Sequence, residues 1–592
     1  MQRKENPGIK VTDYIIDHLL KAGITQGFFM SGGMIAPIAD ACYRKGFGLF
    51  TMHHEQAAAF AAEAQATVTK KIGVAMATSG PGATNLVTGI GSAYFSSNPV
   101  LFITGQVQNS EINTGGKRRQ VGFQETDIVS IVSKITKYSR LVKSPDAIAY
   151  ELEKALFTAT EGRMGPVLLD IPFDVQLSDV APESLAHFLG SEEHARLSQK
   201  AKPDEAVLSE VAKMFADSKR PLILIGHGVR LSNAEPGVLK LVEKANVPFV
   251  TSLLGTDVIP TVHPLCYGFI GTYGQRSANF ATANADLLLV LGSRLDVRQI
   301  GPRSGFAQAA KIIHVDIDQS ELNASVNEDV SVEMDISDFV NALLPLLARK
   351  ELGEWLSFLD GLKIRYKGPE QRVRTNEIDP IKAIRLLSDR YGSDGIVAVD
   401  VGSHQLWFGQ GWETKEGQTV MTNGGMGPMG FSLPAAVGAS IATGRREVLV
   451  VTGDGGLQVN IQEMQTVARN KLPVKIAVFD NNALILVTQF QSDFLGGRNI
   501  GSLPTGGYDS PDFVKVARAY GFSAEYANTS GELEEKIGWL VRQKGASLLQ
   551  IKVPQEYWVV PKTKSGSPMH DMSPRLDKGE YASAVKYAKG MK

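Results

Sequence analysis

Two short polar motifs, each placed directly after an apolar run, constrain the fold of this 592-residue chain more than any other feature. Gly453-Asp454-Gly455-Gly456 follows the apolar residues 448–451, and Asn481-Asn482 follows residues 474–479. The residues between the motifs, 459–468, have the apolar periodicity of a helix. This order of strand, turn, helix, strand and turn predicts a βαβ unit, which places the carboxyl ends of both strands at one edge of a parallel sheet. Asp454 and Asn481 are therefore predicted to face the same crevice.

The side chains of these motifs suit a hard cation and a phosphate. Mg²⁺ accepts carboxylate, amide and main-chain oxygens as ligands and keeps open positions for phosphate oxygens. Glycine lets a diphosphate approach the main chain closely. Gly-Asp-Gly alone is most often a simple turn, but the second motif at this spacing favours a site for a metal-bound diphosphate cofactor. The pattern resembles the signature of enzymes that use thiamine diphosphate, in which Asp454, Asn481 and the main-chain oxygen of Ala483 would bind the metal.

Length and composition are those of a soluble protein with several domains. A chain of 592 residues is too long for one hydrophobic core, and 43% hydrophobic and 21% charged residues are ordinary values. The net charge of −1 gives no electrostatic reason to expect nucleic acid or an anionic membrane as a partner. The two cysteines, Cys42 and Cys266, predict neither a disulfide framework nor a cysteine metal site. Because there is no signal-peptide pattern and no apolar stretch near the ~20 residues that span a bilayer, we expect a cytoplasmic location.

Strand-like apolar runs alternate with helical patterns along most of the chain, which predicts α/β domains with parallel sheets. Polar stretches divide these runs into three blocks. We predict domains at residues 8–180, 200–348 and 376–560, followed by a tail at residues 561–592.

A candidate catalytic carboxylate lies in the first block. Glu55 follows a short apolar strand and precedes the alanine-rich helical stretch 57–66. In isolation, a carboxylate at such a junction usually caps the helix or offsets its dipole. Thiamine diphosphate, however, requires a carboxyl group against its aminopyrimidine ring to promote removal of the thiazolium proton, and a partly buried glutamate can shuttle that proton near neutral pH. Glu55 is the candidate for this role.

Longer motifs extend the resemblance to one family in particular, acetolactate synthase. They occur in the order found in that family, at residues 54–56, 77–86, 103–107, 123–125, 135–137, 165–167, 427–436 and 460–463. The resemblance runs from about residue 10 to residue 553. It implies the three-domain fold of thiamine-diphosphate enzymes, with pyrimidine, central and diphosphate domains. It also implies a homodimer or homotetramer whose catalytic sites lie where the first domain of one subunit meets the third domain of another.

The resemblance also implies roles for single residues. Glu55 would be the pyrimidine-facing carboxylate, Met429 the apolar prop that bends the cofactor, and Gly427 the carbonyl that receives its amino group. The substrate side would be lined by Gly33, Phe123, Gln124 and Lys137. Further cofactor contacts would come from His404, Gly453, Asp454, Gly455, Gly456, Asn481 and Leu484. From the residues alone, Met429 would more often be plain core packing, and Lys137 a solvated side chain.

The middle block suggests a second cofactor. Gly226 and Gly228 supply two glycines of a dinucleotide fingerprint, but Leu231 takes the place of the third, so this motif alone is weak evidence. Acidic residues near the ends of two apolar strands suit ribose hydroxyls. These segments resemble those that contact FAD in acetolactate synthase, where the overall chemistry involves no net redox change. The implied FAD contacts are Arg163, Gly228, Arg294, Asp316 and Asp335. The alternative is a middle domain kept as a scaffold, as in flavin-free relatives.

Several departures from the family pattern concern the second substrate. Phe490 stands where acetolactate synthases carry a tryptophan that shapes the pocket for the second 2-oxo acid. Val297 replaces an aspartate beside Arg298, the expected carboxylate-binding arginine, although Arg298 itself can still grip a carboxylate. Ser403 replaces a glutamine near the diphosphate.

A loop and the tail raise the same question. The connection from residue 108 to residue 122 is longer than usual and contains Lys117-Arg118-Arg119, which form either a solvated loop or a contact for the phosphates of a large acceptor. Residues 568–574 resemble the ending of carboligases from branched-sugar pathways of bacterial surface polysaccharides. Those relatives transfer an acetyl unit from pyruvate to a keto-sugar nucleotide.

We therefore predict a thiamine-diphosphate carboligase that decarboxylates a 2-oxo acid, with pyruvate as the first candidate, and transfers the two-carbon unit to a second carbonyl. Acetolactate formation is the default reaction. Acetyl transfer to a keto-sugar nucleotide is the first alternative, and a flavin-dependent pyruvate oxidase is the second. A non-catalytic cofactor-binding subunit is disfavoured, because Glu55, Asp454 and Asn481 are all present.

Overall fold

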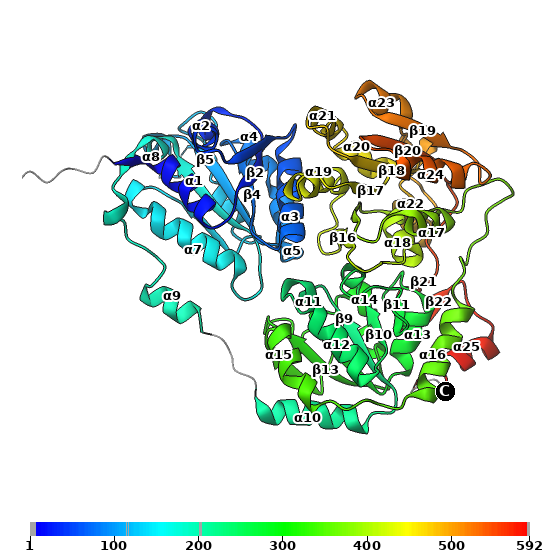
Figure 1. The fold of residues 1–592 in the computed structure, drawn as a ribbon. Helices are drawn as coiled ribbons and strands as arrows, with labels where there is room; N and C mark the ends of the chain where they lie inside the picture. The colour runs from blue at the N-terminus through cyan, green and yellow to red at the C-terminus, as the bar shows by residue number, and fades with distance from the viewer. Residues whose placement is uncertain (1–7, 114, 117, 200–203, 589–592) are drawn as a thin grey trace, which may run out of the picture.

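Three six-stranded parallel sheets, each flanked by helices, organise the protein (Figure 1). The computed structural model describes residues 8–113, 115–116, 118–199 and 204–588. The predicted α/β class with parallel sheets is confirmed. In Figure 1 the first and third sheets lie side by side with α3 and α19 between them, and the second sheet lies below both.

The first sheet has the strand order β3-β2-β4-β5-β7-β6. Its strands are β2 (Gln26–Phe29), β3 (Gly48–Thr51), β4 (Gly73–Ala77), β5 (Val100–Gln106), β6 (Tyr138–Leu141) and β7 (Val167–Pro172). Its helices are α1 (Val11–Lys21), α2 (Ala36–Lys45), α3 (Glu55–Thr69), α4 (Pro81–Asn85), α5 (Val87–Phe95), α6 (Ile128–Val132), α7 (Ile148–Thr160) and α8 (Phe173–Leu177). Strands β4, β5 and β7 are buried on both faces, which explains their nearly continuous apolar sequences. The short strands β1 (Ile9–Lys10) and β8 (Asp179–Val180) pair antiparallel at its border.

The second sheet has the order β11-β10-β9-β12-β13-β14. Its strands are β9 (Pro221–Ile225), β10 (Phe249–Thr251), β11 (Cys266–Phe269), β12 (Leu287–Leu291), β13 (Lys311–Asp316) and β14 (Val330–Glu333). The segment that leads into it carries α9 (Glu192–Leu197), and its helices are α10 (Glu205–Asp217), α11 (Gly228–Leu231), α12 (Glu235–Ala245), α13 (Arg276–Asn284), α14 (Val297–Ile300), α15 (Ile336–Leu343) and α16 (Gly353–Arg365).

The third sheet has the order β16-β15-β17-β18-β20-β19. Its strands are β15 (Ile396–Val399), β16 (Thr419–Met421), β17 (Val448–Gly453), β18 (Val474–Asp480), β19 (Ser523–Ala527) and β20 (Ser547–Lys552). Its helices are α17 (Pro380–Arg390), α18 (Ser403–Gly411), α19 (Ser432–Ala442), α20 (Asp454–Val459), α21 (Glu463–Arg469), α22 (Ile485–Phe494), α23 (Phe513–Ala519) and α24 (Leu533–Arg542). Strands β17 and β18 are parallel neighbours, so the predicted βαβ unit is confirmed.

The helix predicted between these two strands differs in one respect. The structure has two short helices, α20 and α21, interrupted at Asn460, in place of one helix at residues 459–468. The interruption has a physical cause: the Asn460 side chain donates hydrogen bonds to the Gly430 carbonyl at 2.9 Å and to the Gln56 Oε1 atom at 3.0 Å. The Gly-Asp-Gly-Gly motif thus begins a helix instead of forming a loop before it.

Helices α3 and α19 join the first and third domains. Both are rich in alanine, so their backbones approach closely: a Cβ atom added to Gly438 would lie 2.1 Å from the Ala61 carbonyl oxygen. Phe60 and Phe431 pack edge to face beside this crossing, with ring centroids 5.5 Å apart. One continuous apolar cluster therefore spans both domains.

The tail returns to the central domain. Strands β21 (Lys562–Thr563) and β22 (Met572–Ser573) pair antiparallel at the border of the second and third domains, and α25 (Lys578–Ala584) lies next to α16 (Figure 1). The Thr563 N–H donates to the Thr272 carbonyl at 2.7 Å. The Arg276 side chain, 2% exposed, binds both Glu370 and the Pro574 carbonyl. None of the helices among the described residues has both the length and the apolar character needed to cross a membrane.

Replacing Gly438 tests the close crossing of α3 and α19. Gly438→Ala should lower the free energy of unfolding by about 1–3 kcal/mol, because the added methyl group overlaps the Ala61 backbone. Gly361→Ala is the matched control, since Gly361 lies in the exposed part of α16 with no atom within 4 Å of an added Cβ. It should stabilise the protein by about 0.5–1 kcal/mol. Thermal and denaturant midpoints measure the stability change of each variant. Equal changes for Gly438→Ala and Gly361→Ala would refute the close contact between α3 and α19.

Candidate active site

The carboxyl edge of the third sheet brings the two polar motifs together. Asp454 is 3% exposed and Asn481 8% exposed. The Ala483 N–H donates to Asp454 Oδ2 at 3.1 Å, and the Tyr508 hydroxyl donates to Asp454 Oδ1 at 3.1 Å. Burial, and then the neighbouring Asp480 carboxylate, raise the pKa of Asp454 to about 7. A divalent cation would offset both effects by stabilising the charged carboxylate.

The donor set for such a cation is mixed. Among the described residues, no group of three or more histidine, cysteine, aspartate or glutamate side chains is arranged to hold a metal. One carboxylate, one amide and one main-chain oxygen, from Asp454, Asn481 and Ala483, suit Mg²⁺, which takes the rest of its ligands from phosphate and water.

The glycines of the motif form a cradle beside this carboxylate. A Cβ atom on Gly453 would lie 2.8 Å from His404 Nδ1, and one on Gly455 would lie 2.4 Å from Leu484 Cδ2 and 3.0 Å from Met429 Cε. The predicted cofactor residues His404, Met429 and Leu484 therefore gather around one turn. The space next to that turn is available only because the turn lacks side chains.

Two polar atoms near the cradle have no partner within the described part of the chain. The His404 Nε2 and Ser403 Oγ atoms are buried and make no hydrogen bond there. Burial lowers the pKa of His404 to about 3, so its imidazole is neutral. Buried polar groups are normally satisfied, so these two atoms fit a polar ligand such as a diphosphate.

The candidate base lies at the carboxyl edge of the first sheet. Glu55 is the first residue of α3, and the His54 side chain caps the helix by accepting from the Gln56 N–H at 3.0 Å. The Glu55 side chain is buried, at 7% exposure, and its Oε2 accepts a hydrogen bond from Asn85 Nδ2 at 3.0 Å. The partner of the Glu55 carboxylate is therefore a neutral amide.

The other predicted substrate residues lie in different settings. Around Gly33 there is open space, with no atom within 4 Å of an added Cβ. Gln124 packs against Gly80, where an added Cβ would lie 2.9 Å from Gln124 Cβ. Phe123 is 83% exposed. Lys137 donates to the carbonyls of Thr158 and Glu161 at the end of α7, and burial lowers its pKa to about 8.

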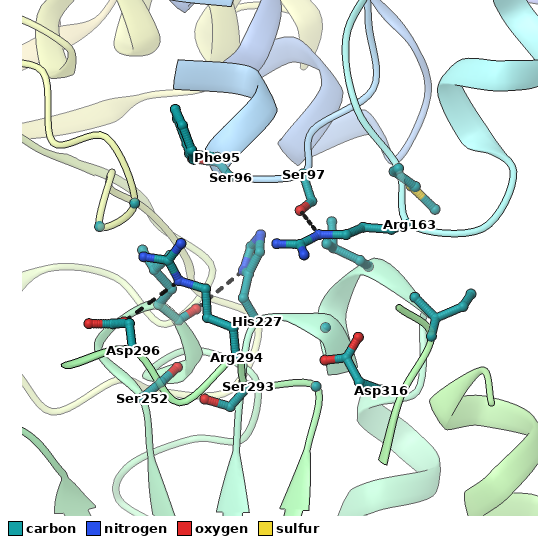
Figure 2. A pocket seen from close by; sticks show the side chains of 18 of the residues that line it. Phe95, Ser96, Ser97, Arg163, His227, Ser252, Ser293, Arg294, Asp296 and Asp316 are labelled. Atoms are coloured by element: carbon teal, nitrogen blue, oxygen red, sulfur yellow. Dashed lines mark hydrogen bonds and ion pairs between the residues drawn. The ribbon is translucent and has the colours of Figure 1, made fainter. Parts of the chain in front are cut away.

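A cavity of about 640 Å³ opens where the three domains meet, which is within the range of cofactor sites. All five residues predicted to contact a flavin line it: Arg163, Gly228, Arg294, Asp316 and Asp335. Figure 2 shows Arg163 and Arg294 on either side of His227. Gly427 of the third domain and Arg298 of the central domain also line the cavity, so it extends from the central sheet to the loop that carries Met429.

Local interactions hold these lining residues in place. Arg163 donates to Ser97 Oγ at 3.0 Å and forms ion pairs with Asp318 at 3.0 Å and Glu321 at 2.5 Å. A Cβ atom on Gly228 would lie 2.8 Å from Gly292 Cα, so two strand ends can approach closely only through these glycines. Burial raises the pKa of Asp316, whose carboxylate suits hydrogen-bond donors such as ribose hydroxyls.

Comparison with known proteins decides the family. Three models match the chain: the thiamine pyrophosphate enzyme N-terminal TPP binding domain over residues 9–131, the central domain over 208–343 and the C-terminal TPP binding domain over 400–551. The chain belongs to the thiamine pyrophosphate enzymes. Thiamine pyrophosphate is thiamine diphosphate, so the predicted resemblance is confirmed and the protein is a thiamine-diphosphate-dependent enzyme.

Acetolactate synthase large subunits are similar to it over nearly their whole length. The probable acetolactate synthase large subunit of Methanocaldococcus jannaschii is 34% identical over 92% of this chain and 92% of its own. The acetolactate synthase isozyme 1 large subunit of Escherichia coli K12 is 35% identical over 95% of this chain and 97% of its own. The chloroplastic acetolactate synthase 1 of Zea mays is 34% identical over 95% of this chain and 88% of its own.

Bonds between the two thiamine-binding domains of this enzyme hold the turn that bears Glu55. Glu463, which is fully buried, accepts from the His53 N–H at 2.9 Å, and Arg469 donates to the Thr51 carbonyl. Asn460 bridges Gln56 and the carbonyl next to Met429. The sequence motif at residues 460–463 marks these residues, but nothing in the sequence shows that their partners lie in another domain.

His227 and Asn423 are lining residues of the cavity that the sequence prediction missed. Burial lowers the pKa of His227 to about 4, and its Nδ1 lies 3.3 Å from the Leu254 carbonyl oxygen. Asn423 Oδ1 accepts from the Gly427 N–H at 3.0 Å, and Asn423 Nδ2 donates to Ser92 Oγ at 2.6 Å. The signal for His227 was its place inside the Gly226-x-Gly228 motif. Asn423 had no comparable signal.

A buried carboxylate completes the network behind Asn423. Glu63 in α3 accepts hydrogen bonds from Ser92 Oγ at 2.5 Å and from Asn98 Nδ2 at 3.0 Å. Burial raises the pKa of Glu63 to about 7 in spite of these bonds. The loop that carries Gly427 is thus connected through Asn423 and Ser92 to the helix that begins with Glu55.

Glu63→Gln tests the pKa shift. Because the folded state binds the Glu63 proton more tightly than the unfolded state, stability is lost as pH rises from about 4.5 to about 7. This loss amounts to about 3 kcal/mol. Glu63→Gln should remove that part of the pH dependence. The free energy of unfolding of the variant, relative to that of the wild type, should therefore be higher at pH 8 than at pH 4.5. Denaturant midpoints across this pH range measure the difference. Glu183→Gln, at an exposed position just after the first domain, is the control, and parallel curves for wild type and Glu63→Gln would contradict the shift.

Proposed function

We propose that this enzyme decarboxylates pyruvate and joins the remaining two-carbon unit to a second carbonyl compound. The observation that carries the proposal is the cradle at Gly453–Gly456, with buried, unpartnered polar atoms of Ser403 and His404 beside it. The likeness to acetolactate synthase large subunits over more than nine-tenths of the chain makes a second pyruvate the first acceptor to test.

Mg²⁺ and thiamine diphosphate would be held at the carboxyl edge of the third sheet. Asp454, Asn481 and the main-chain oxygen of Ala483 would bind the metal. The turn at Gly453, Gly455 and Gly456 would receive the diphosphate with His404 and Leu484, while Gly427 and Met429 would contact the rings. The proximity of these groups to one turn supports the assignment.

The chemistry needs a proton relay and a dry site. Bound thiamine diphosphate supplies a carbon nucleophile that adds to a 2-oxo acid and accepts the electrons released with CO₂. Glu55 would hold and move the proton against the aminopyrimidine ring. In the overall reaction the C1–C2 bond of pyruvate breaks, its electron pair forms the new C–C bond to the acceptor carbonyl, and the acceptor oxygen takes up one proton. No net oxidation occurs, and the buried setting of Glu55 helps to exclude water.

The three-domain cavity would hold FAD through Arg163, Gly228, Arg294, Asp316 and Asp335, all of which line it. Its volume and its acidic groups at strand ends support this assignment.

The active unit would be a homodimer or homotetramer in which the first domain of one subunit meets the third domain of another. Gly33, Phe123, Gln124 and Lys137 would then line the substrate side, with Arg298 and Phe490 near the acceptor. In the single chain, Phe123 is 83% exposed and Phe490 is 55% exposed. Large exposed aromatic side chains support a second subunit that would cover them.

Glu55→Gln tests the carboligase assignment. Wild-type protein with thiamine diphosphate and Mg²⁺ should release CO₂ from pyruvate and form acetolactate or another ligation product, identified by mass spectrometry. Glu55→Gln should slow this turnover by at least ~10²-fold, because the proton relay is lost. Calorimetric titration with thiamine diphosphate should show that the variant still binds the cofactor. Near-normal ligation by the variant would exclude Glu55 as the base.

The flavin prediction separates ligation from oxidation. The purified protein should carry FAD, and Arg163→Ala should reduce the amount of flavin retained, measured by absorbance. Ligation should continue after the flavin is reduced with dithionite, because the proposed reaction transfers no net electrons. Bleaching of the flavin by pyruvate, with peroxide released at the rate of pyruvate consumption, would instead indicate a pyruvate oxidase.

A further inference from the structure

Tyr273 lies where the central domain, the third domain and the tail meet. It follows β11, and its carbonyl accepts a hydrogen bond from Gln410 Nε2 of α18 at 3.0 Å. Two cations approach its ring from different parts of the chain. The Arg298 guanidinium carbon and the Lys562 Nζ atom each lie 5.8 Å from the ring centroid. Tyr273 and Arg298 both line the three-domain cavity.

The two cations differ in how they are neutralised. The Arg298 side chain makes no hydrogen bond and no ion pair with any residue that the structure describes, so it presents a free guanidinium at the cavity wall. Lys562 forms an ion pair with Asp493, whose side chain is 44% exposed. An ion pair with such an exposed partner contributes little stability, and lysine has a flexible stem. An anion with more negative charge can therefore displace Asp493 and bind the Lys562 ammonium with only a small loss of free energy.

The carboxylate that holds Lys562 lies beside two exposed aromatic rings. Phe490, Asp493 and Phe494 are at positions i, i+3 and i+4 of α22, which share one helix face. The Phe490 and Phe494 rings lie 4.8 Å apart and are 55% and 54% exposed. The same helix face thus presents an aromatic surface next to the carboxylate that pairs with Lys562.

We propose that Arg298, Lys562, Phe490 and Phe494 bind an acceptor that carries a nucleoside diphosphate, and this rests on the carboligase function proposed above. The diphosphate would bind Arg298 and Lys562, with Asp493 released, and the base would stack on Phe490 and Phe494. A second pyruvate presents a single carboxylate, which Arg298 alone can bind bidentately. It leaves the second cation and the aromatic pair without a role. A diphosphate uses both cations, and aromatic rings stack with any base.

The position of the site fits the chemistry. The cavity that Arg298 lines also reaches Gly427, the residue assigned to the rings of thiamine diphosphate. The carbonyl end of such an acceptor would lie beside the bound FAD, between Arg298 and Gly427, which both line the cavity, while the diphosphate stays at Tyr273. The acceptor class is then a keto group on a sugar or similar unit linked to a nucleoside diphosphate.

The test uses the holoenzyme saturated with thiamine diphosphate, Mg²⁺ and FAD, with UDP and inorganic pyrophosphate as probes. Calorimetry should detect binding of both probes to the wild type. Lys562→Met should weaken both by roughly 10-fold and reduce the salt dependence of binding, since one charge-assisted contact is lost. Phe494→Ala should weaken the binding of UDP by roughly 10-fold but leave the binding of pyrophosphate unchanged, because only UDP carries a base. Lys564→Met, in the same tail at an exposed position, is the matched control and should change neither.

A second measurement separates this inference from the proposed function. CO₂ release from pyruvate with ferricyanide as oxidant reports the donor half of the reaction. UDP should inhibit ligation but not this half-reaction. If pyruvate is never decarboxylated, the carboligase proposal fails even where UDP binds. If decarboxylation proceeds but UDP does not bind, or binds equally to Lys562→Met and Lys564→Met, the acceptor site is refuted.

The aromatic pair could instead be covered by a second copy of the chain. In that case Phe494→Ala would shift the oligomeric state in size-exclusion chromatography and leave UDP binding unchanged. That combination would also overturn the proposal. An unchanged oligomer with weakened UDP binding would support it.

Discussion

The close crossing of α3 and α19 is the contact on which the rest of the structure depends. It is possible only because both helices present small side chains, so that Gly438 lies directly against the Ala61 backbone. Helix α3 begins with Glu55, and α19 follows the loop that carries Gly427 and Met429. Packing the two helices therefore sets the position of the candidate base relative to the cofactor loop of the same chain. A larger residue at the crossing would move both elements at once.

Buried polar groups then fix this arrangement in detail. Apolar packing between two alanine-rich helices is tolerant of sliding, whereas hydrogen bonds are directional. Glu463 binds the turn before Glu55, Asn460 binds both Gln56 and the Gly430 carbonyl, and Asn423 links the Gly427 loop to Ser92. Leaving any of these groups unpaired in the buried interface would be costly. The network thus selects one relative position of the two domains.

The central domain and the tail complete the site from the other side. The central domain supplies most of the residues that line the three-domain cavity, and the tail adds β21, which binds Thr272 next to Tyr273. The elements farthest apart in sequence therefore meet where an acceptor would enter. Of the cationic loop considered for that role, Lys117 lies outside the described residues, and Arg118 and Arg119 are exposed. The pair of cations at Tyr273 has the firmer structural basis, because Arg298 lines the cavity and aromatic rings lie alongside.

Local patterns in the sequence were sufficient for the fold class and for one edge of the site. Apolar runs followed by Gly453–Gly456 and by Asn481-Asn482 predicted adjacent parallel strands, since side-chain periodicity and turn residues report local backbone geometry. The helix between them was only partly right, because the interruption at Asn460 comes from partners in distant parts of the chain. The Lys137 bonds at the end of α7 were likewise not foreseen from its motif.

Only the tertiary structure decided which distant side chains meet. Glu463 and His53 are 410 positions apart, and Asn460 and Gln56 are 404 apart. No periodicity connects such residues, because their contact depends on how whole helix and sheet surfaces dock. The approach of Lys562 to Tyr273 has the same origin. The sequence by itself therefore determined the α/β domains and the strand ends that carry Asp454 and Asn481. The docking of those domains determined the cavity, the bonds around Glu55 and the pair of cations at Tyr273.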